Sequence, residues 1–114
     1  EDARVVRQDL LYRLALLELE VGNAARAADR ADEGLNLGRA DDVFTANLLV
    51  ARARAREALD RPREAAGDYF DALEINEKLL GDALGLQRRR SLSRLLGSST
   101  MVFKLVRASM GGTA

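Results

Sequence analysis

Cysteine and histidine are both absent from this sequence of 114 residues. The absence of cysteine excludes disulfides, thiolate zinc sites and cysteine nucleophiles, and nothing in the chain requires an oxidising compartment. The absence of histidine removes the commonest general base at neutral pH and the commonest transition-metal ligand. Most hydrolases and metalloenzymes are therefore disfavoured, and we expect a protein that is not an enzyme and that uses no metal or cofactor.

Aromatic residues, proline and long apolar runs are also scarce. Aromatics make up 4% of the residues, tryptophan is missing and Pro62 is the one proline. The chain is instead rich in Ala, Leu, Arg and Glu, which favour helices, so an all-α fold is expected. No apolar run approaches the roughly 18 residues of a membrane-spanning helix, and the N-terminus shows neither Met nor a signal-peptide pattern. We expect a cytoplasmic piece of a larger protein with no membrane contact.

The length is that of one ordinary domain, and we expect residues 1–114 to form a single one. The charge is zero overall but is unevenly distributed along the chain. Residues 1–82 hold 12 basic and 18 acidic residues, a net charge of −6, whereas residues 83–114 hold 6 basic residues and no acidic one. The two parts therefore carry opposite net charges.

Apolar spacing predicts a first pair of helices joined by a short turn. The i, i+4, i+7, i+11 stripe of an amphipathic helix runs over about residues 3–21 and consists of Leu10, Leu14, Leu17 and Val21. Gly22 and Asn23 then break the pattern. A second helical pattern runs to about Leu37, and Gly38 is expected to end it because glycine accepts the left-handed conformation.

A second pair of helices is predicted to follow. The two aspartates at 41–42 offer N-caps for a helix over about residues 43–59. Pro62 suits the first position of the next helix, because the amide proton that it lacks would have no partner there. We expect this fourth helix to run to about Leu80, with Gly81 as its stop.

The two pairs repeat one another at an offset of 38 residues. The segment EVGNAARAADRADEGLNL (20–37) lies over ALDRPREAAGDYFDALEI (58–75), with small and large apolar residues at the same places. The matched residues are Leu11 with Leu49, Ala15 with Ala53, Val21 with Leu59, Ala27 with Ala65, Ala28 with Ala66, Leu35 with Leu73 and Leu37 with Ile75. Such matching is what a stack of helical hairpins needs. Two alanine contacts should let the helices of each hairpin approach closely: Ala15 with Ala27, and Ala53 with Ala65.

The second copy carries a recognisable motif, with Ala65, Tyr69, Ala72 and Leu73 at their expected spacing. On these residues the chain resembles the tetratricopeptide repeat family over residues 8–79. The first copy departs from the motif at Ala31 and Gly34, where the motif prefers an aromatic residue and alanine. The offset exceeds the usual repeat of roughly 34 residues, so we expect inserted residues around 38–45. The segment ALEINEKLLGDA (72–83) is further similar to the longer repeat of kinesin light chains and many bacterial signalling proteins.

The resemblance implies a right-handed stack of antiparallel helical hairpins, a tetratricopeptide-like superhelix. Repeat 1 is expected over about 8–41 and repeat 2 over about 46–79. Two further apolar patterns predict a third, degenerate or capping hairpin over about 83–110: Leu84, Leu92, Leu95 and Leu96, then Met101, Val102, Leu105, Val106 and Met110. We expect this hairpin to be looser, because Arg90 and Val102 replace the small residues that allow close packing.

The resemblance also implies that the first helix of each hairpin lines a concave face. Helical spacing would present twelve residues there: Asp9, Tyr12, Leu16, Leu19 and Glu20, then Asn47, Val50, Arg54 and Glu57, then Gln87, Ser91 and Arg94. A mixed surface of this kind suits a peptide or a partner helix, so the expected function is a protein interaction scaffold. The alternative is that Leu16, Leu19 and Val50 belong to the core. The exposed ends of a short array of hairpins also favour self-association, so a homodimer is a further expectation.

A basic cluster near the C-terminus suggests a second function. It consists of Arg88, Arg89, Arg90, Arg94, Lys104 and Arg107, and clustered guanidinium groups bind phosphate oxygens. However, consecutive helical residues point about 100° apart, and no aromatic residues interleave with the cluster. A solvated face is therefore favoured over nucleic-acid binding. The alternative functions are a regulatory or sensor module of a bacterial transcription regulator or kinase, an enzyme that uses carboxylates, and a helical bundle with no groove.

Overall fold

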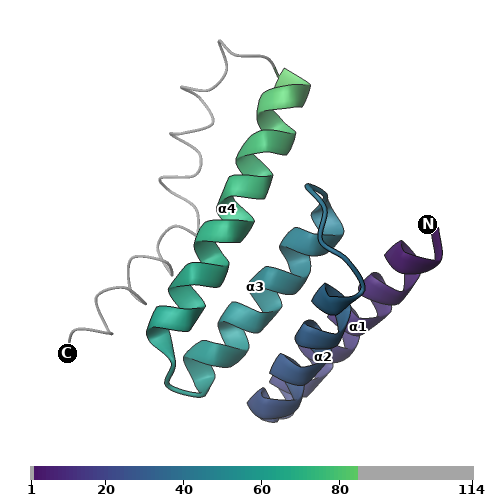
Figure 1. The fold of residues 1–114 in the computed structure, drawn as a ribbon. Helices are drawn as coiled ribbons and strands as arrows, with labels where there is room; N and C mark the ends of the chain where they lie inside the picture. Colours follow the sequence, from purple (N-terminus) through teal and green to yellow (C-terminus); the bar gives the residue numbers. More distant parts are fainter. Residues whose placement is uncertain (1, 85–114) are drawn as a thin grey trace.

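The computed structural model describes residues 2–84, which form four α-helices that follow one another in chain order (Figure 1). Their bounds are α1 Asp2–Glu20, α2 Ala24–Asn36, α3 Val43–Ala58 and α4 Pro62–Leu84. Within this part of the chain the expected all-α fold is confirmed. Helix α1 packs against α2, α3 packs against α4, and α3 also packs against both helices of the first pair. The expected third hairpin lies outside the described residues, apart from its first two, which continue α4.

The turns inside the two helix pairs have the same hydrogen bonds at positions 38 residues apart. The amide of Asn23 donates to the carbonyl of Glu18 (2.7 Å), and the amide of Arg61 donates to that of Arg56 (2.8 Å). The residue before each donor lies in the left-handed region: Gly22 has φ 85°, and Asp60 has φ 61°. This pattern closes a helix by satisfying carbonyls that have no partner inside it. The equivalence of the two turns therefore extends to their backbone conformation.

The helix boundaries agree with the sequence prediction except at the end of α4. Asp42 is the N-cap of α3, where its Oδ1 accepts a hydrogen bond from the amide of Thr45 (2.9 Å), and Pro62 is the first residue of α4. The expected stop at Gly81 is wrong, because α4 continues to Leu84. A glycine inside a helix costs only about 1 kcal/mol relative to alanine, so the helix can pass through it.

Alanines bring the helices of each pair together. Ala15, Ala27, Ala51 and Ala55 form one cluster of fully buried residues, and the fully buried Ala53, Ala65 and Tyr69 form another together with the buried Ala66. The two expected alanine contacts are therefore present. Alanine side chains are small, so they allow the helix backbones to lie close together. Larger side chains fill another part of the space between the two pairs.

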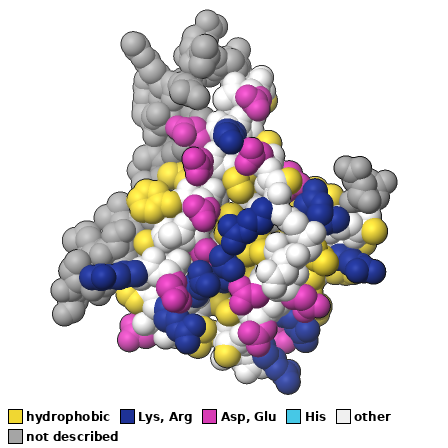
Figure 2. Space-filling model, in the orientation of Figure 1, with side chains coloured by type: hydrophobic (Ala, Val, Ile, Leu, Met, Phe, Trp, Pro, Cys, Tyr) yellow, Lys and Arg dark blue, Asp and Glu magenta, His cyan; other side chains and the backbone are white. Residues whose placement is uncertain are grey.

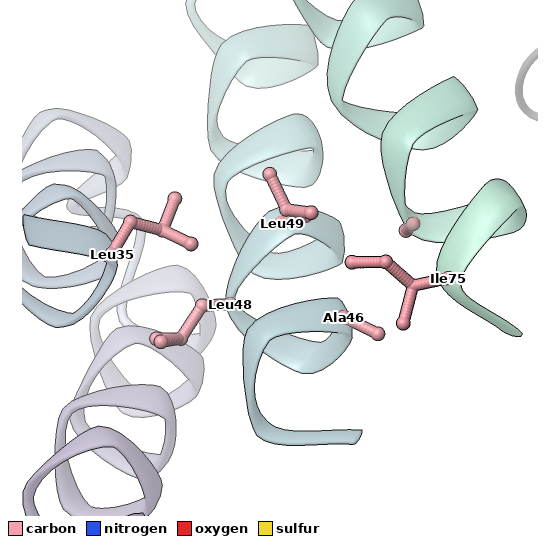
Figure 3. Close-up of a cluster of buried hydrophobic side chains, with 6 residues drawn as sticks. Leu35, Ala46, Leu48, Leu49 and Ile75 are labelled. Carbon is pink, nitrogen blue, oxygen red and sulfur yellow. The ribbon is translucent and has the colours of Figure 1, made fainter. Parts of the chain in front are cut away.

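The larger side chains form a cluster between α2, α3 and α4. Leu48 of α3 is directed toward α2, where Leu35 lies, and Ile75 of α4 is directed toward α3 (Figure 3). Ala46, Leu49 and Ala72 complete the buried part of this cluster. The central position of α3 explains why its residues contribute to all three buried clusters, and it makes α3 the main scaffold for the surfaces described below.

The apolar stripe predicted for the first helix does not face the core. Helix α1 is present, but the residues of the stripe are exposed, and its buried side is built around Gln8 and Ala15. Sequence periodicity could not choose between the two sides, because α1 is apolar on both. Contact with α2 selects the side with the smaller residue, since Ala15 lies in the alanine cluster with Ala27.

Buried polar groups connect the start of α1 to the loop between the two pairs. The Nε2 of Gln8 donates to the carbonyls of Gly34 (3.0 Å) and Gly38 (2.7 Å). Its Oε1 accepts from Arg4 (2.7 Å), which also donates to Asp42 (3.2 Å). Gln8 thereby supplies a donor to the carbonyl of Gly38 in the loop after α2 and a second donor to the carbonyl of Gly34, which also accepts from the amide of Leu37. Across residues 2–84, the helices are either too short or too polar to cross a membrane.

Candidate functional site

A depression of about 550 Å³ lies between the later parts of α1 and α3. Its lining consists of Arg13, Leu16, Leu17, Leu19, Glu20 and Arg54. Four of these were expected on the concave face from the sequence: Leu16, Leu19, Glu20 and Arg54. The structure therefore brings predicted residues from both helices into one place. We call this depression the α1–α3 groove.

The groove combines aliphatic side chains with charges of both signs. Leu16 and Leu19 are half-buried, whereas Glu20 and Arg54 are exposed. Leu19 also packs against the alanine cluster, so its position is held from behind. Arg13 is engaged with Asp9 at 3.1 Å, an ion pair between two exposed residues one helical turn apart. Such a surface offers apolar contact area at its centre and guanidinium or carboxylate groups around it.

The other predicted residues of α1 and α3 do not line the groove. Tyr12 and Val50 are half-buried and pack against the core clusters, as the core alternative supposes. Asp9 accepts from Arg13, and Asn47 is half-buried. Glu57 is engaged by a tyrosine of α4. Three further predicted residues lie outside the described part of the chain: Gln87, Ser91 and Arg94.

Tyr69 holds Glu57 across the contact between α3 and α4. Its hydroxyl donates to the Oε1 of Glu57 at 2.6 Å, and the tyrosine is fully buried. Burial raises the pKa of Tyr69 above its ordinary value, and the hydrogen bond to Glu57 raises it further, while nearby Arg54 opposes the shift. Glu57 is thus a structural acceptor here, at a short distance from the Arg54 end of the groove.

A network of ion pairs connects α2, α3 and α4, and sequence reasoning missed it. Asp68 is buried and accepts two hydrogen bonds from Arg52, at 2.9 and 3.0 Å, and one from Arg56, at 2.8 Å. Arg52 also donates to Asp32 of α2 at 2.7 Å. Burial opposes the charged form of Arg52, but the hydrogen bonds to Asp68 and Asp32 outweigh it and raise the pKa. The network fixes three helices relative to one another through forked guanidinium contacts.

The sequence did contain a signal for this network. The segment ARARARE (51–57) alternates alanine and arginine, so on a helix its first and third arginines lie on one side and the second on another. The alanines between them are fully buried, which places Arg52 and Arg56 at the edge of the core. An arginine at such an edge requires a carboxylate partner, because an unpaired buried charge is costly.

A smaller depression of about 310 Å³ lies between the loop before α3 and the middle of α4. It is lined by Arg39, Ala40, Asp41, Thr45, Leu49, Asp71, Glu74 and Ile75. An exposed ion pair spans the same region, with the Nζ of Lys78 at 3.0 Å from the Oδ2 of Asp41, and this contact raises the pKa of Lys78. Figure 2 shows basic and acidic side chains intermixed, with hydrophobic side chains between them, over the face in view.

No cluster of three metal-ligating residues is present within residues 2–84. Asp9, Asp32 and Asp68 accept from arginines, Glu57 accepts from Tyr69, and Asp41 accepts from Lys78. The basic cluster that would carry nucleic-acid binding lies outside the described residues, so that alternative stays a prediction. A comparison with protein-family models, curated proteins and solved structures found no match to this chain.

Proposed function

We propose that this chain is a protein-interaction module of tetratricopeptide-like hairpins that binds a segment of a partner protein in the α1–α3 groove. The observation that carries the proposal is the lining of the groove. Residues that the concave-face hypothesis named on two different helices, Leu16 and Leu19 on α1 and Arg54 on α3, line one depression. Ligand sites in proteins are concave surfaces with apolar walls and a few placed polar groups.

The chemistry of the lining indicates the kind of segment that would fit. Leucine side chains offer contact area to an aliphatic or aromatic side chain, which would supply most of the affinity. Arg54 and Arg13 favour a carboxylate on the partner, and Glu20 favours a basic group near the end of α1. We therefore expect a short helical or extended peptide with one large apolar anchor and an acidic residue close to it.

The tetratricopeptide-like part of the proposal draws on the equivalence of the two helix pairs. Ala15 and Ala53 are both fully buried, as are Ala27 and Ala65. The turns share their hydrogen bonds and their left-handed residue. A stack of such units presents one helix of each to a common face, and this common face is the location proposed for the groove.

Peptides selected from a random library displayed on phage provide a test. The library is selected against the full chain, and the binding of enriched peptides is measured by calorimetry with the wild type, Arg54→Glu and Arg63→Glu. Arg63 is exposed on α4 and forms no ion pair within the described residues, so it controls for the change in charge. We expect Arg54→Glu to weaken binding by about tenfold or more, and Arg63→Glu to leave it unchanged.

A second variant, Leu16→Glu, tests the apolar part of the same groove. It should abolish binding of the selected peptides while the far-UV circular dichroism stays that of a helical protein, because Leu16 is only half-buried. The proposal fails if no peptide is enriched, or if the enriched peptides bind Leu16→Glu and Arg54→Glu as tightly as the wild type.

A further inference from the structure

A second surface of α1 is apolar and contacts no other helix of the described chain. Five large side chains, 41–71% exposed, follow one another along the side of α1 opposite Gln8 and onto the residue after the helix. They are Val6, Leu10, Leu14, Leu17 and Val21, and we call them the α1 stripe. Single exposed apolar residues are ordinary on a protein surface, but a contiguous stripe of them marks an interaction site.

The residues of α3 that lie 38 positions after the stripe show how this side of a helix packs when neighbouring helices cover it. Leu48 and Ala55 are fully buried against the first helix pair, and Arg52 forms its ion pair with α2. In the stripe, Leu14 and Leu17 stand in place of Arg52 and Ala55. Leucine is too large for the close contact that Ala55 makes with its neighbouring alanines. The stripe would therefore not pack against a helix like α2 as closely as α3 does. It suits contact with another helix whose leucine side chains protrude.

The order of residue types in the stripe is the same in both directions. It has a valine at each end, a leucine four residues inside each valine, and Leu14 between the two leucines, four residues after Leu10 and three before Leu17. In a pair with two-fold symmetry every contact occurs twice, with the two residues exchanged between the copies. Two antiparallel α1 helices would bring Val6 against Val21 and Leu10 against Leu17. The spacing of 4, 3 and 4 residues from Leu10 to Val21 is that of the seam along which coiled-coil helices pack.

The charges beside the stripe select the antiparallel direction. Arg7 lies next to the stripe near its N-terminal end, and Glu18 and Glu20 lie next to it near the other end. An antiparallel pair places Arg7 of each helix near the acidic end of the other, whereas a parallel pair places like charges together. Arg7 and Glu20 form no ion pair within residues 2–84, so both charges are available to a second copy.

We propose that two copies of this chain form a symmetric dimer in which their α1 stripes pack antiparallel. This goes beyond the proposed function, because the stripe is a different surface of α1: of its five residues only Leu17 also lines the groove, and Glu20 lies beside both surfaces. The dimer covers five of the nine large apolar side chains that are exposed within the described residues, and it leaves Leu16 and Arg54 outside the contact.

Sedimentation equilibrium of the full chain tests the contact. The double variant Leu10→Glu with Leu14→Glu places charges in the seam, and Val43→Glu places one on a side chain of α3 that is 50% exposed. We expect a dimer for the wild type and for Val43→Glu. The double variant should raise the dimer dissociation constant on the order of 100-fold, because its carboxylates would lose water without gaining a partner. Circular dichroism checks that all three proteins remain helical.

Single cysteines test the direction, since the chain has no cysteine of its own. Under mild oxidation, Val6→Cys mixed with Val21→Cys should form a disulfide-linked dimer, and neither variant should do so alone. In a parallel dimer each variant would link to itself, because residues 6 and 21 are about 22 Å apart along a helix.

Three results would overturn the proposal. The first is a wild type that stays monomeric. The second is a dimer that is unaffected by the two glutamates at positions 10 and 14, which would place the contact elsewhere. The third is a monomer that these glutamates destabilise more than Val43→Glu does, which would identify residues 85–114 as the occupant of the stripe.

Discussion

A side chain at Gly34 would collide with Leu48. A methyl group on Gly34 would lie 2.7 Å from Cδ1 and 2.8 Å from Cδ2 of Leu48. Leu48 is fully buried and lies with Leu35 in the cluster between the two helix pairs. The glycine therefore makes room on α2 for the side chain through which α3 packs against it. This contact is one reason why residue 34 is glycine, whereas the equivalent residue 38 positions later is Ala72.

Gly34→Ala should destabilise the protein. Overpacking a buried site costs about 1–3 kcal/mol, which exceeds the gain of about 1 kcal/mol from replacing glycine inside a helix. Gly67→Ala is the matched control, since a methyl group there meets no atom within 4 Å. It should stabilise α4 by about 1 kcal/mol. Urea unfolding measures the free energy of unfolding of both variants. Equal changes in this free energy for Gly34→Ala and Gly67→Ala would contradict the close contact between residue 34 and Leu48.

Gln8→Leu should lower the free energy of unfolding by about 1–3 kcal/mol. The variant keeps the size of the side chain but leaves the carbonyl of Gly38 without its donor and that of Gly34 with the amide of Leu37 alone, and an unsatisfied buried group costs about 1–3 kcal/mol. Arg26→Leu introduces the same side chain at an exposed position of α2 and should change the stability by less than about 0.5 kcal/mol. Similar losses for the two variants would rule out this role of Gln8.

Asp68→Asn should weaken the contact between α3 and α4 by roughly 3 kcal/mol. Asp68 accepts from both Arg52 and Arg56, and removing its charge leaves guanidinium groups at the edge of the core with less compensation. Arg13→Ala removes an exposed ion pair with Asp9 and should cost less than about 1 kcal/mol. Thermal unfolding compares the two variants. A loss of stability in Asp68→Asn no larger than that in Arg13→Ala would contradict this role of Asp68.

Asp42→Asn should reduce the loss of stability in acid. Burial opposes the charged form of Asp42, but hydrogen bonds from Thr45 and Arg4 outweigh it and hold the pKa below its ordinary value of 3.8. The carboxylate therefore stabilises the folded chain above about pH 4, and this contribution disappears as the pH falls through the lowered pKa. The free energy of unfolding is measured from neutral pH into acid. If the free energy of unfolding fell equally with pH in the wild type and in Asp42→Asn, Asp42 would not make this pH-dependent contribution.

Asp60→Gly should stabilise the chain by up to about 1 kcal/mol, because Asp60 has φ 61° and glycine adopts this region without strain. The opposite change at the equivalent turn, Gly22→Ala, should cost about 1 kcal/mol or more. A methyl group at Gly22 meets no atom within 4 Å, so this cost would come from the backbone alone. If Asp60→Gly and Gly22→Ala changed the melting temperature in the same direction, the two turns would not be equivalent.

Local signals predicted the helices and the alanine contacts. Asp42 and Pro62 act within one turn of the chain, and Ala15 with Ala27 follows from a hairpin whose helices must approach closely. The groove was predicted in part. Leu16 and Arg54 reach it, whereas Tyr12 turns toward the core. The difference is position along α1: Tyr12, Leu16 and Leu19 share one side of the helix, but only its later turns line the groove, and periodicity does not tell where along a helix a neighbour packs.

The sequence by itself determined that residues 2–84 form helices in two equivalent pairs, because caps, turns and the 38-residue repetition act along the chain. Only the tertiary structure decided which side of α1 is buried and which carboxylate meets Arg52. It also decided that α4 continues past Gly81. The reason is that α1 has two apolar sides and several aspartates lie within reach of an arginine. Contact between helices distant in sequence selects one arrangement among those that local preferences allow equally.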